Sequence, residues 1–294
     1  MLANNSKSNK IQNRQTILKL LAVKAPISRV ELSALSGLSK MSLTNIISEF
    51  KQEGLITEVG VDTTAEGKRK PVLLELSDGA ICALGVTVAD KEIKSCYADI
   101  KGNVLSFDAC PLPTGDWPNA VISYIKTALS KSPFALSGIG VSFDATVSFE
   151  QAENVRKQLL ETEFPISLFF GSAAQSALLA EKRYGGAKGI DSVLYAAYHN
   201  GLCCAYYVNK KLLQGHRSRA GFIPCADYEE AIAKLKGIIY FTDPQAVLFE
   251  ENFAEYVTCR EVERIGISVR ICTLGEQAPI LGSAALVFEN EYFN

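Results

Sequence analysis

Residues 28–54 read SRVELSALSGLSKMSLTNIISEFKQEG, and this stretch decides the fold of the amino-terminal part. Its start has a capping-box pattern, in which the Ser28 hydroxyl accepts from a helical amide and Glu31 reaches back. The helix that follows ends at Gly37, because glycine tolerates the left-handed backbone of a helix end. Ser39 then begins a longer helix, which the last glycine of the stretch ends. A short helix, a turn with glycine and a second helix predict a helix-turn-helix motif.

The second helix of this motif has two different faces. Its apolar residues recur at helical spacing and should pack on the preceding helices; they are Leu43, Ile46, Ile47 and Phe50. The opposite face has short hydrogen-bonding side chains and no acid before Glu49, which suits insertion into a major groove beside phosphates. The side chains of the motif that we expect to contact DNA are Ser28, Arg29, Ser39, Lys40, Ser42, Thr44, Asn45 and Ser48.

Two further elements complete the predicted domain. A helix over 11–25 precedes the motif, with the apolar stripe Ile11, Ile17, Leu18, Leu20 and Leu21. Residues 55–59 and 71–76 have the composition of strands, and the polar loop between them ends in Lys68, Arg69 and Lys70. Such a hairpin is typical of a wing, whose basic tip contacts DNA at the minor groove. The alternative is a small helical domain with a solvated basic loop.

Charge is unevenly distributed along the chain. The first 70 residues hold eleven Lys/Arg and six Asp/Glu, a net charge of +5. The whole chain carries −2, so the remaining 224 residues carry −7. A basic module beside an acidic body is the pattern expected when one end of a protein meets phosphate.

Composition excludes several classes of protein. Hydrophobic residues make up 48% of the 294 residues and charged residues 21%, which indicates packed globular domains. A polar amino terminus and no run of eighteen apolar residues predict a cytoplasmic protein without a membrane span. The eight cysteines form no Cys-x-x-Cys pair, and there are only two histidines. We therefore expect no metal and no cofactor, with the cysteines as small buried hydrophobes.

The rest of the chain alternates strand-like and helix-like segments, as an α/β domain does. The strand-like segments are 81–88, 93–99, 104–112, 138–143 and 246–250. The helix-like segments are 119–130, 228–240 and 280–289.

Several stretches together resemble repressors of the ROK family (repressors, open reading frames and sugar kinases). Beside the opening motif they are GKRKPVLLEL, GAICALGVTV, ADIKGNVL, GIGVSF, SALLAEKRYGGAKG, VNKKLLQG, AGFIP, DPQAVLFE and LGSAALVFE. The resemblance implies a winged helix-turn-helix domain over 1–77. It also implies a two-lobed α/β domain of the actin/hexokinase, ribonuclease H-like type over 78–294.

The chain departs from the family's kinases where they bind phosphate and activate the sugar. The family's glycine-rich Asp-x-Gly-Gly-Thr turn is matched by residues 86–91, which have no glycine pair to let amides approach a phosphate. The aspartate of the family's Asn-Asp-x-Asn motif is matched by Ala173. Alanine cannot accept the proton of a sugar hydroxyl, so the resemblance implies a protein with no catalytic residue and no phosphoryl transfer.

The family's sugar and zinc sites are altered as well. Residues 220–225 (AGFIPC) replace Ala-Gly-Glu-x-Gly-His, so the sugar-contacting glutamate and the histidine are lost. The cysteine-rich zinc loop is missing after them, and segment 144–164 lacks the family's Asn/Trp stretch. The resemblance places four residues at the former sugar site, where an aromatic ring suggests an apolar or collapsed effector pocket: Asp144, Ser172, Gln175 and Phe222.

These observations predict a sequence-specific transcription regulator that binds a double-stranded DNA operator. Family analogy implies a repressor that forms a homodimer or higher homo-oligomer on a near-palindromic operator. Two interpretations of the body stay open: a sensor of a small, sugar-like effector, and a regulator or scaffold controlled by a protein partner without a small-molecule ligand. A divergent sugar kinase with a different base is a third interpretation, which Ala173 disfavours.

Overall fold

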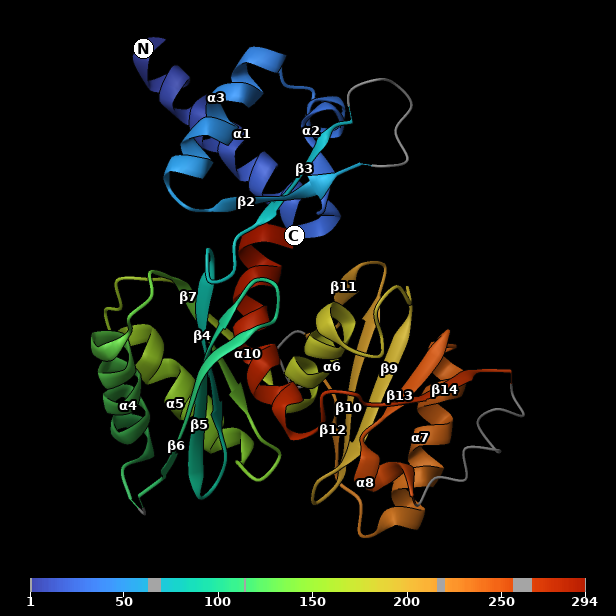
Figure 1. The fold of residues 1–294 in the computed structure, drawn as a ribbon. Helices are drawn as coiled ribbons and strands as arrows, with labels where there is room; N and C mark the ends of the chain where they lie inside the picture. Colours follow the sequence, from blue (N-terminus) through green and yellow to red (C-terminus); the bar gives the residue numbers. More distant parts are fainter. Residues whose placement is uncertain (1, 63–69, 114, 216–219, 256–265, 294) are drawn as a thin grey trace. The chain divides into compact units, whose positions relative to one another are not determined.

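The computed structural model describes residues 2–62, 70–113, 115–215, 220–255 and 266–293. The chain divides into two units (Figure 1), the first with residues 1–81, 99–103 and 288–294 and the second with residues 82–98 and 104–287. The turn 99–103 joins the first unit because Asp99 Oδ2 accepts from Gly79 N (3.0 Å) and Ile100 N donates to Ile81 O (2.9 Å). Contacts so distant in sequence leave no local pattern. The functional boundary at residue 77 stays a prediction.

α-Helices and a small sheet build the first unit. They are α1 (Leu2–Lys24), β1 (Ile27–Ser28), α2 (Arg29–Ser36), α3 (Lys40–Gln52), β2 (Ile56–Val61) and β3 (Val72–Leu76). The largest buried side chains of this core are Ile17, Leu21, Leu32, Ile47, Phe50 and Leu74. The predicted helix-turn-helix and the strands of the hairpin are thereby confirmed. Ile11 is 59% exposed, so the apolar stripe of α1 is shorter than predicted.

β3 is the central strand of this sheet, which has the order β1-β3-β2. Leu74 pairs with Ile27 in β1, and Leu76 pairs with Ile56 in β2. All four side chains are buried, because alternate residues of a strand point to the same face. The sheet therefore closes the core that the helices begin. The terminal turn η2 (Glu289–Phe293) belongs to the same unit and contacts α1.

A mostly parallel sheet begins the second unit. Its strands are β4 (Cys82–Val88), β5 (Glu92–Asp99), β6 (Val104–Pro111), β7 (Leu136–Phe143) and β8 (Leu168–Ser172). The order is β6-β5-β4-β7-β8, and β7 pairs in parallel with both β4 and β8. One face is covered by α4 (Trp117–Lys131) and α5 (Phe149–Glu161) (Figure 1). These helices bury Val121, Ile125, Val155 and Leu159 against the sheet.

A second sheet repeats this topology. Its strands are β9 (Val193–Tyr198), β10 (Leu202–Val208), β11 (Lys211–Leu212), β12 (Phe222–Ile223), β13 (Ala246–Phe249) and β14 (Ser268–Ile271). The order β11-β10-β9-β13-β14 matches that of the first sheet, and β12 pairs with β10. Alternate residues of β9 point to opposite faces of the sheet. On one face, Leu194 and Ala196 pack toward α7 (Tyr228–Thr242) and α8 (Glu251–Ala254). On the other face, Tyr195 and Ala197 pack toward α6 (Ala173–Tyr184). The predicted two-lobed α/β architecture is confirmed.

α10 (Ala278–Phe288) follows the short turn η1 (Gly275–Gln277) and lies between the first sheet and α6 (Figure 1). It is apolar around its circumference because neighbours cover both sides. A Cβ on Gly140 of β7 would lie 1.7 Å from Ser283 O, and one on Gly282 would lie 1.7 Å from Ser176 O. Backbone thus meets backbone on both sides of α10, which only glycine permits.

Candidate nucleic-acid interface and ligand pocket

Local hydrogen bonds begin and end both helices of the motif where the sequence predicts. Ser28 Oγ accepts from Glu31 N (3.3 Å) and the Glu31 carboxylate accepts from Ser28 N (3.0 Å), so the capping box is confirmed. Gly37 follows α2 with a φ of 69°, and Ser39 Oγ accepts from Ser42 N (3.2 Å) at the start of α3. Ser28 is only 3% exposed. Its expected contact with DNA is therefore corrected, because the side chain is occupied by the helix cap.

α3 presents a polar surface opposite its buried face. The buried side chains are Leu43, Ile46, Ile47 and Phe50, as the periodicity predicts. The exposed side chains are Lys40, Met41, Thr44, Asn45 and Ser48, and Ser42 is half-buried. Short side chains on this face leave room for a base edge, and the thioether of Met41 adds an apolar contact suited to a thymine methyl group.

The polar groups of this face differ in their freedom to bind a base. The Ser39 and Ser42 hydroxyls lie 3.0 Å apart, and Thr44 Oγ1 donates to the carbonyl oxygen four residues earlier (2.7 Å). These three hydroxyls are thus held by the helix itself. Within the described part of the chain, Asn45 and Ser48 make no hydrogen bond with their side chains. Their polar groups are therefore free of the helix and exposed on this face.

The acidic residues of α3 turn toward α1 and are neutralised there. Lys10 Nζ lies 2.6 Å from Glu49 Oε1, and the Arg14 guanidinium bridges Glu49 (2.7 Å) and Glu53 (2.5 Å). The hydrogen bond from Lys10 lowers the pKa of Glu49. Arg14 also lies 4.5 Å from the centroid of the Phe50 ring. The negative charge of α3 is therefore compensated away from its exposed face.

β2 and β3 form the base of the predicted wing. Lys68 and Arg69, which we expected to contact DNA, lie outside the described residues, whereas Lys70 is described and exposed. The Arg29 guanidinium lies 3.8 Å from a Glu58 carboxylate oxygen in β2. Because both side chains are largely exposed, this pair leaves Arg29 accessible to a phosphate.

A cavity of about 590 Å³ opens in the second unit at the carboxyl ends of parallel strands. Asp144 follows β7, Ser172 ends β8, His199 follows β9 and Glu250 follows β13, and all four line the cavity. Ligands of open α/β sheets bind in the crevice outside the carboxyl ends of the strands. Both sheets therefore direct their strand ends to one cavity.

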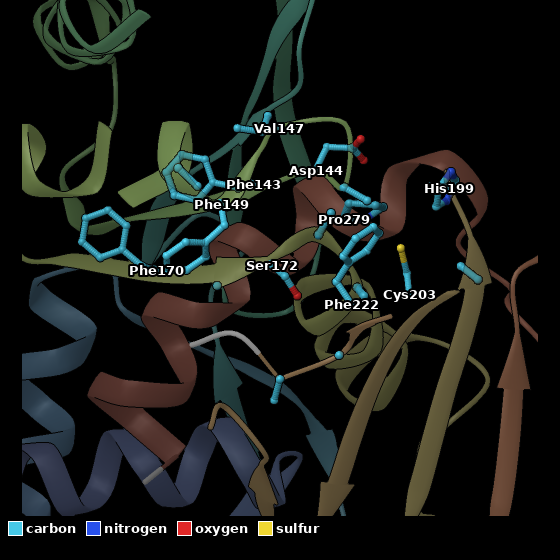
Figure 2. A pocket seen from close by; sticks show the side chains of 18 of the residues that line it. Phe143, Asp144, Val147, Phe149, Phe170, Ser172, His199, Cys203, Phe222 and Pro279 are labelled. Atoms are coloured by element: carbon cyan, nitrogen blue, oxygen red, sulfur yellow. The ribbon is translucent and has the colours of Figure 1, made fainter. Parts of the chain in front are cut away.

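Aromatic side chains form much of the cavity wall. Figure 2 shows Phe143, Phe149 and Phe170 gathered on one side, and Phe222 with Pro279 on the other. Phe149 and Phe222 keep nearly half of their surface exposed. Apolar surface that faces water in this way contributes about 25 cal/mol per Å² when a ligand covers it.

The predicted pocket residues fall in two groups. Asp144, Ser172 and Phe222 line the cavity, as does Ala173, the first residue of α6. Gln175 does not line it, because its side chain is 1% exposed and its Oε1 accepts from Ser172 N (3.0 Å) in the capping box of α6. Its expected place in the pocket is corrected accordingly. The amide of Gln175 stabilises the helix start that carries Ser172.

The cavity also holds a pair that the sequence did not indicate. His199 Nε2 lies 2.8 Å from Glu250 Oε2. The hydrogen bond with Glu250 raises the pKa of His199, although burial opposes the shift, and Asp144 adds to it through its charge. Each of the two residues follows a strand, which is a usable signal in the sequence. Their proximity depends on the parallel pairing of β9 with β13, which the sequence alone does not reveal.

We expect His199 to titrate above the ordinary value of about 6.5. Because its folded pKa is raised, the stability it adds is complete below the unfolded pKa and is lost as pH rises through the folded pKa. An NMR titration of the imidazole resonances measures the pKa of His199, and the His199→Gln variant identifies which resonance belongs to it. Glu250→Gln should lower the pKa of His199, because the variant removes the carboxylate that raises it. A midpoint at or below 6.5 in the unaltered chain would contradict the pairing.

The remaining sequence expectations concern cysteine, metal and membrane. Cys82, Cys96, Cys203 and Cys204 are buried, but Cys110 is exposed on β6, so the expectation of buried cysteines is wrong there. Among the described residues, His, Cys, Asp and Glu side chains form no group of three that could hold a metal ion. No helix in the described ranges has the length and apolar character needed to cross a membrane.

Known proteins resemble both units. A family described as winged helix-turn-helix DNA-binding matches residues 12–57. The xylose repressor of Bacillus spizizenii is 26% identical over 219 residues, which cover 69% of this chain and 57% of the repressor. A crystal structure of a ROK family transcriptional regulator, a homologue of the Escherichia coli MLC protein, covers 96% of both chains with a TM-score of 0.70 and 16% identity.

The likeness of this chain to sugar kinases is one of fold. The ROK hexokinase of Thermus thermophilus has a TM-score of 0.57 at 16% identity, and the match covers 70% of this chain and 98% of the hexokinase. The chain spans little more than half the length of the xylose repressor. The kinase-like fold therefore accounts for the two lobes around the cavity, and the chemistry of the cavity depends on the residues present in this chain.

Proposed function

We propose that this protein is a sequence-specific DNA-binding regulator of transcription of the ROK family that acts as a repressor. The observation that carries the proposal is the exposed face of α3. Within the described residues, Asn45 and Ser48 have no hydrogen-bond partner there, and α1 neutralises the acids of the helix. This face belongs to the segment that matches a DNA-binding family. The repressors among the relatives support repression as the direction of control.

α3 is the recognition helix in this proposal and enters the major groove. The phosphate-contacting groups are Arg29, Lys40 and the wing, and the base-contacting groups are Asn45 and Ser48 with Met41 beside them. Ser39, Ser42 and Thr44 lie at the same surface and contact DNA through groups already fixed by the helix. Two copies of the chain bind two half-sites about 34–36 Å apart, one helical turn of DNA.

Reversing the charge of Lys68, Lys70 and Arg69 to glutamate should weaken binding to every DNA sequence and flatten its salt dependence. Each lost phosphate contact lowers the slope of log K against log salt by about 0.9, so three contacts lower it by about 2.7. Fluorescence anisotropy over a salt series measures the slope. The matched control reverses three exposed lysines of the second unit, Lys126, Lys157 and Lys188. Equal slopes in both triple variants would remove the wing from the interface.

The protein performs no phosphoryl transfer to sugars in this proposal. Ala173 occupies the start of α6 at the cavity, where the family's kinases have an aspartate that accepts the hydroxyl proton. The test incubates the full chain with ATP, magnesium and a panel of hexoses, pentoses and N-acetylhexosamines, with an active ROK kinase as positive control. Turnover that survives repurification would contradict the proposal.

A further inference from the structure

The aromatic side of the cavity offers the hydroxyls of a polyol no hydrogen-bond partner on its phenyl rings. Phe143, Phe149, Phe170 and Phe222 all line it. A sugar hydroxyl buried against a phenyl ring loses its hydrogen bonds to water, at a cost of about 1–3 kcal/mol for each unpaired group. A ligand with an apolar body gains binding free energy instead, because it covers the exposed carbon atoms of the phenyl rings and removes them from water.

The basic side chains at the cavity are already matched by acids. Lys94 Nζ lies 2.6 Å from Glu92 Oε1, and the Arg156 guanidinium lies 3.6 Å from Glu153 Oε1. Arg156 also lies 5.3 Å from the centroid of the Phe170 ring. Both pairs are partly exposed and therefore weak, so the charge of the whole lining decides. Four carboxylates line the cavity, against two permanent cations and one histidine.

Two carboxylates at the cavity lack such a partner. Asp144 and Glu276 line it and form no ion pair within the described residues. Asp144 Oδ1 accepts from Thr146 N (2.9 Å), and its second oxygen has no hydrogen bond in that part of the chain. Glu250, by contrast, is held by His199 at 2.8 Å. The cavity therefore offers a carboxylate oxygen that can accept a hydrogen bond beside an aromatic wall.

The amino terminus of α6 also lies at the cavity, and its partial positive charge offsets the negative charge of the carboxylates only in part. A helix amino terminus carries about half of a positive charge. One of its amides, Gln175 N, already donates to Ser172 Oγ (3.2 Å). The carboxylates that line the cavity still outnumber its cationic side chains, so the net field favours a cation over an anion.

We propose that the cavity binds a small organic cation with an aromatic body, of the arylalkylamine class. The ammonium group donates to the free oxygen of Asp144, and the ring lies among Phe143, Phe149 and Phe170, which Figure 2 shows gathered at one side of the pocket. Ring faces also attract a cation directly. A volume of about 590 Å³ is within the range of small-molecule sites. Control of DNA binding by such a ligand rests on the proposed function, whereas binding itself does not.

The test is isothermal titration calorimetry on the full chain in the absence of DNA. The probes are 2-phenylethylamine, its neutral analogue 2-phenylethanol, the anion 3-phenylpropionate and D-xylose. We expect the amine to bind most tightly. Asp144→Asn should lower the affinity for the amine by about tenfold and leave the affinity for 2-phenylethanol unchanged. Asparagine keeps the oxygen that accepts from Thr146 N and loses only the charge. The matched control is Asp191→Asn, an exposed site outside the cavity.

Several results would overturn the proposal. These are tighter binding of the anion or of xylose, no binding of any probe, or equal amine affinity in the Asp144→Asn and Asp191→Asn proteins. Phe222→Ala supplies a second test, because the Phe222 side chain is half-exposed. This variant should lower the affinities for the amine and for the alcohol by similar factors. Unchanged affinities there would also contradict the site. Since no DNA is present, failure here leaves the DNA-binding proposal untouched.

Discussion

Replacing Asn45 and Ser48 together with alanine should lower the affinity for the operator by about a hundredfold. Asparagine pairs with two atoms of adenine in the major groove, and a good bidentate contact contributes roughly 1–3 kcal/mol of discrimination. Both side chains are exposed and lack an internal hydrogen bond within the described residues, so the fold should not change. Adding Thr44→Ala should have a smaller effect, because that hydroxyl already donates to the backbone.

Anisotropy titrations with operator and with scrambled DNA separate specific from general binding for this variant. Affinity for scrambled DNA should stay the same, since phosphate contacts are retained. Gln15→Ala, at an exposed position on α1, is the control for mutation of the same unit. If the double variant discriminates operator from scrambled DNA as well as the control does, α3 is not the recognition helix.

Glu181→Ala should destabilise the second unit by about 3–5 kcal/mol. Its carboxylate is 0% exposed and accepts four hydrogen bonds: from Gly186 N (2.6 Å), Thr273 N (2.6 Å), Leu274 N (2.8 Å) and Thr273 Oγ1 (2.9 Å). These bonds tie α6 to the segment between β14 and α10. Each buried donor left without an acceptor costs about 1–3 kcal/mol, and water entering the space offsets part of the total. The thermal midpoint of the second unit should fall by about 10 °C.

Two companion variants make the Glu181 result specific. The glutamine of Glu181→Gln keeps one acceptor oxygen, and its amide group can donate to Thr273 Oγ1. That amide group also faces Gly186 N, which then has no acceptor. We therefore expect Glu181→Gln to lose less stability than Glu181→Ala. Glu161→Ala removes a carboxylate at the exposed end of α5 and should change stability by no more than about 0.5 kcal/mol. A Glu181→Ala protein as stable as the Glu161→Ala protein would contradict the role of the buried carboxylate.

Local signals account for what could be predicted of the first unit. Ser28, Gly37 and Ser39 act within four residues of themselves, so their caps follow from neighbouring letters of the sequence. The same locality explains an error: a capping serine and a DNA-contacting serine look alike in sequence. Only the burial of Ser28 distinguishes them.

The cavity shows the limit of local inference more clearly. The approximate places of Asp144, Ser172 and Phe222 came from a family resemblance, and all three line the cavity. His199 and Glu250 meet through strand pairing across 51 positions, and no short pattern indicates that contact. The resemblance left open whether the pocket is collapsed. The structure has an open cavity, which favours a small ligand over a purely structural body.

The measurement that tests the account most directly is selection of bound duplexes from a random pool by the purified chain at near-physiological salt. A dimeric, sequence-specific regulator should enrich one motif with two-fold symmetric half-sites spaced by about 10 base pairs. The account also predicts that the Asn45/Ser48 double alanine variant fails to enrich that motif. Recovery of unselected DNA, bound in a salt-sensitive manner by both proteins alike, would contradict a sequence-specific regulator.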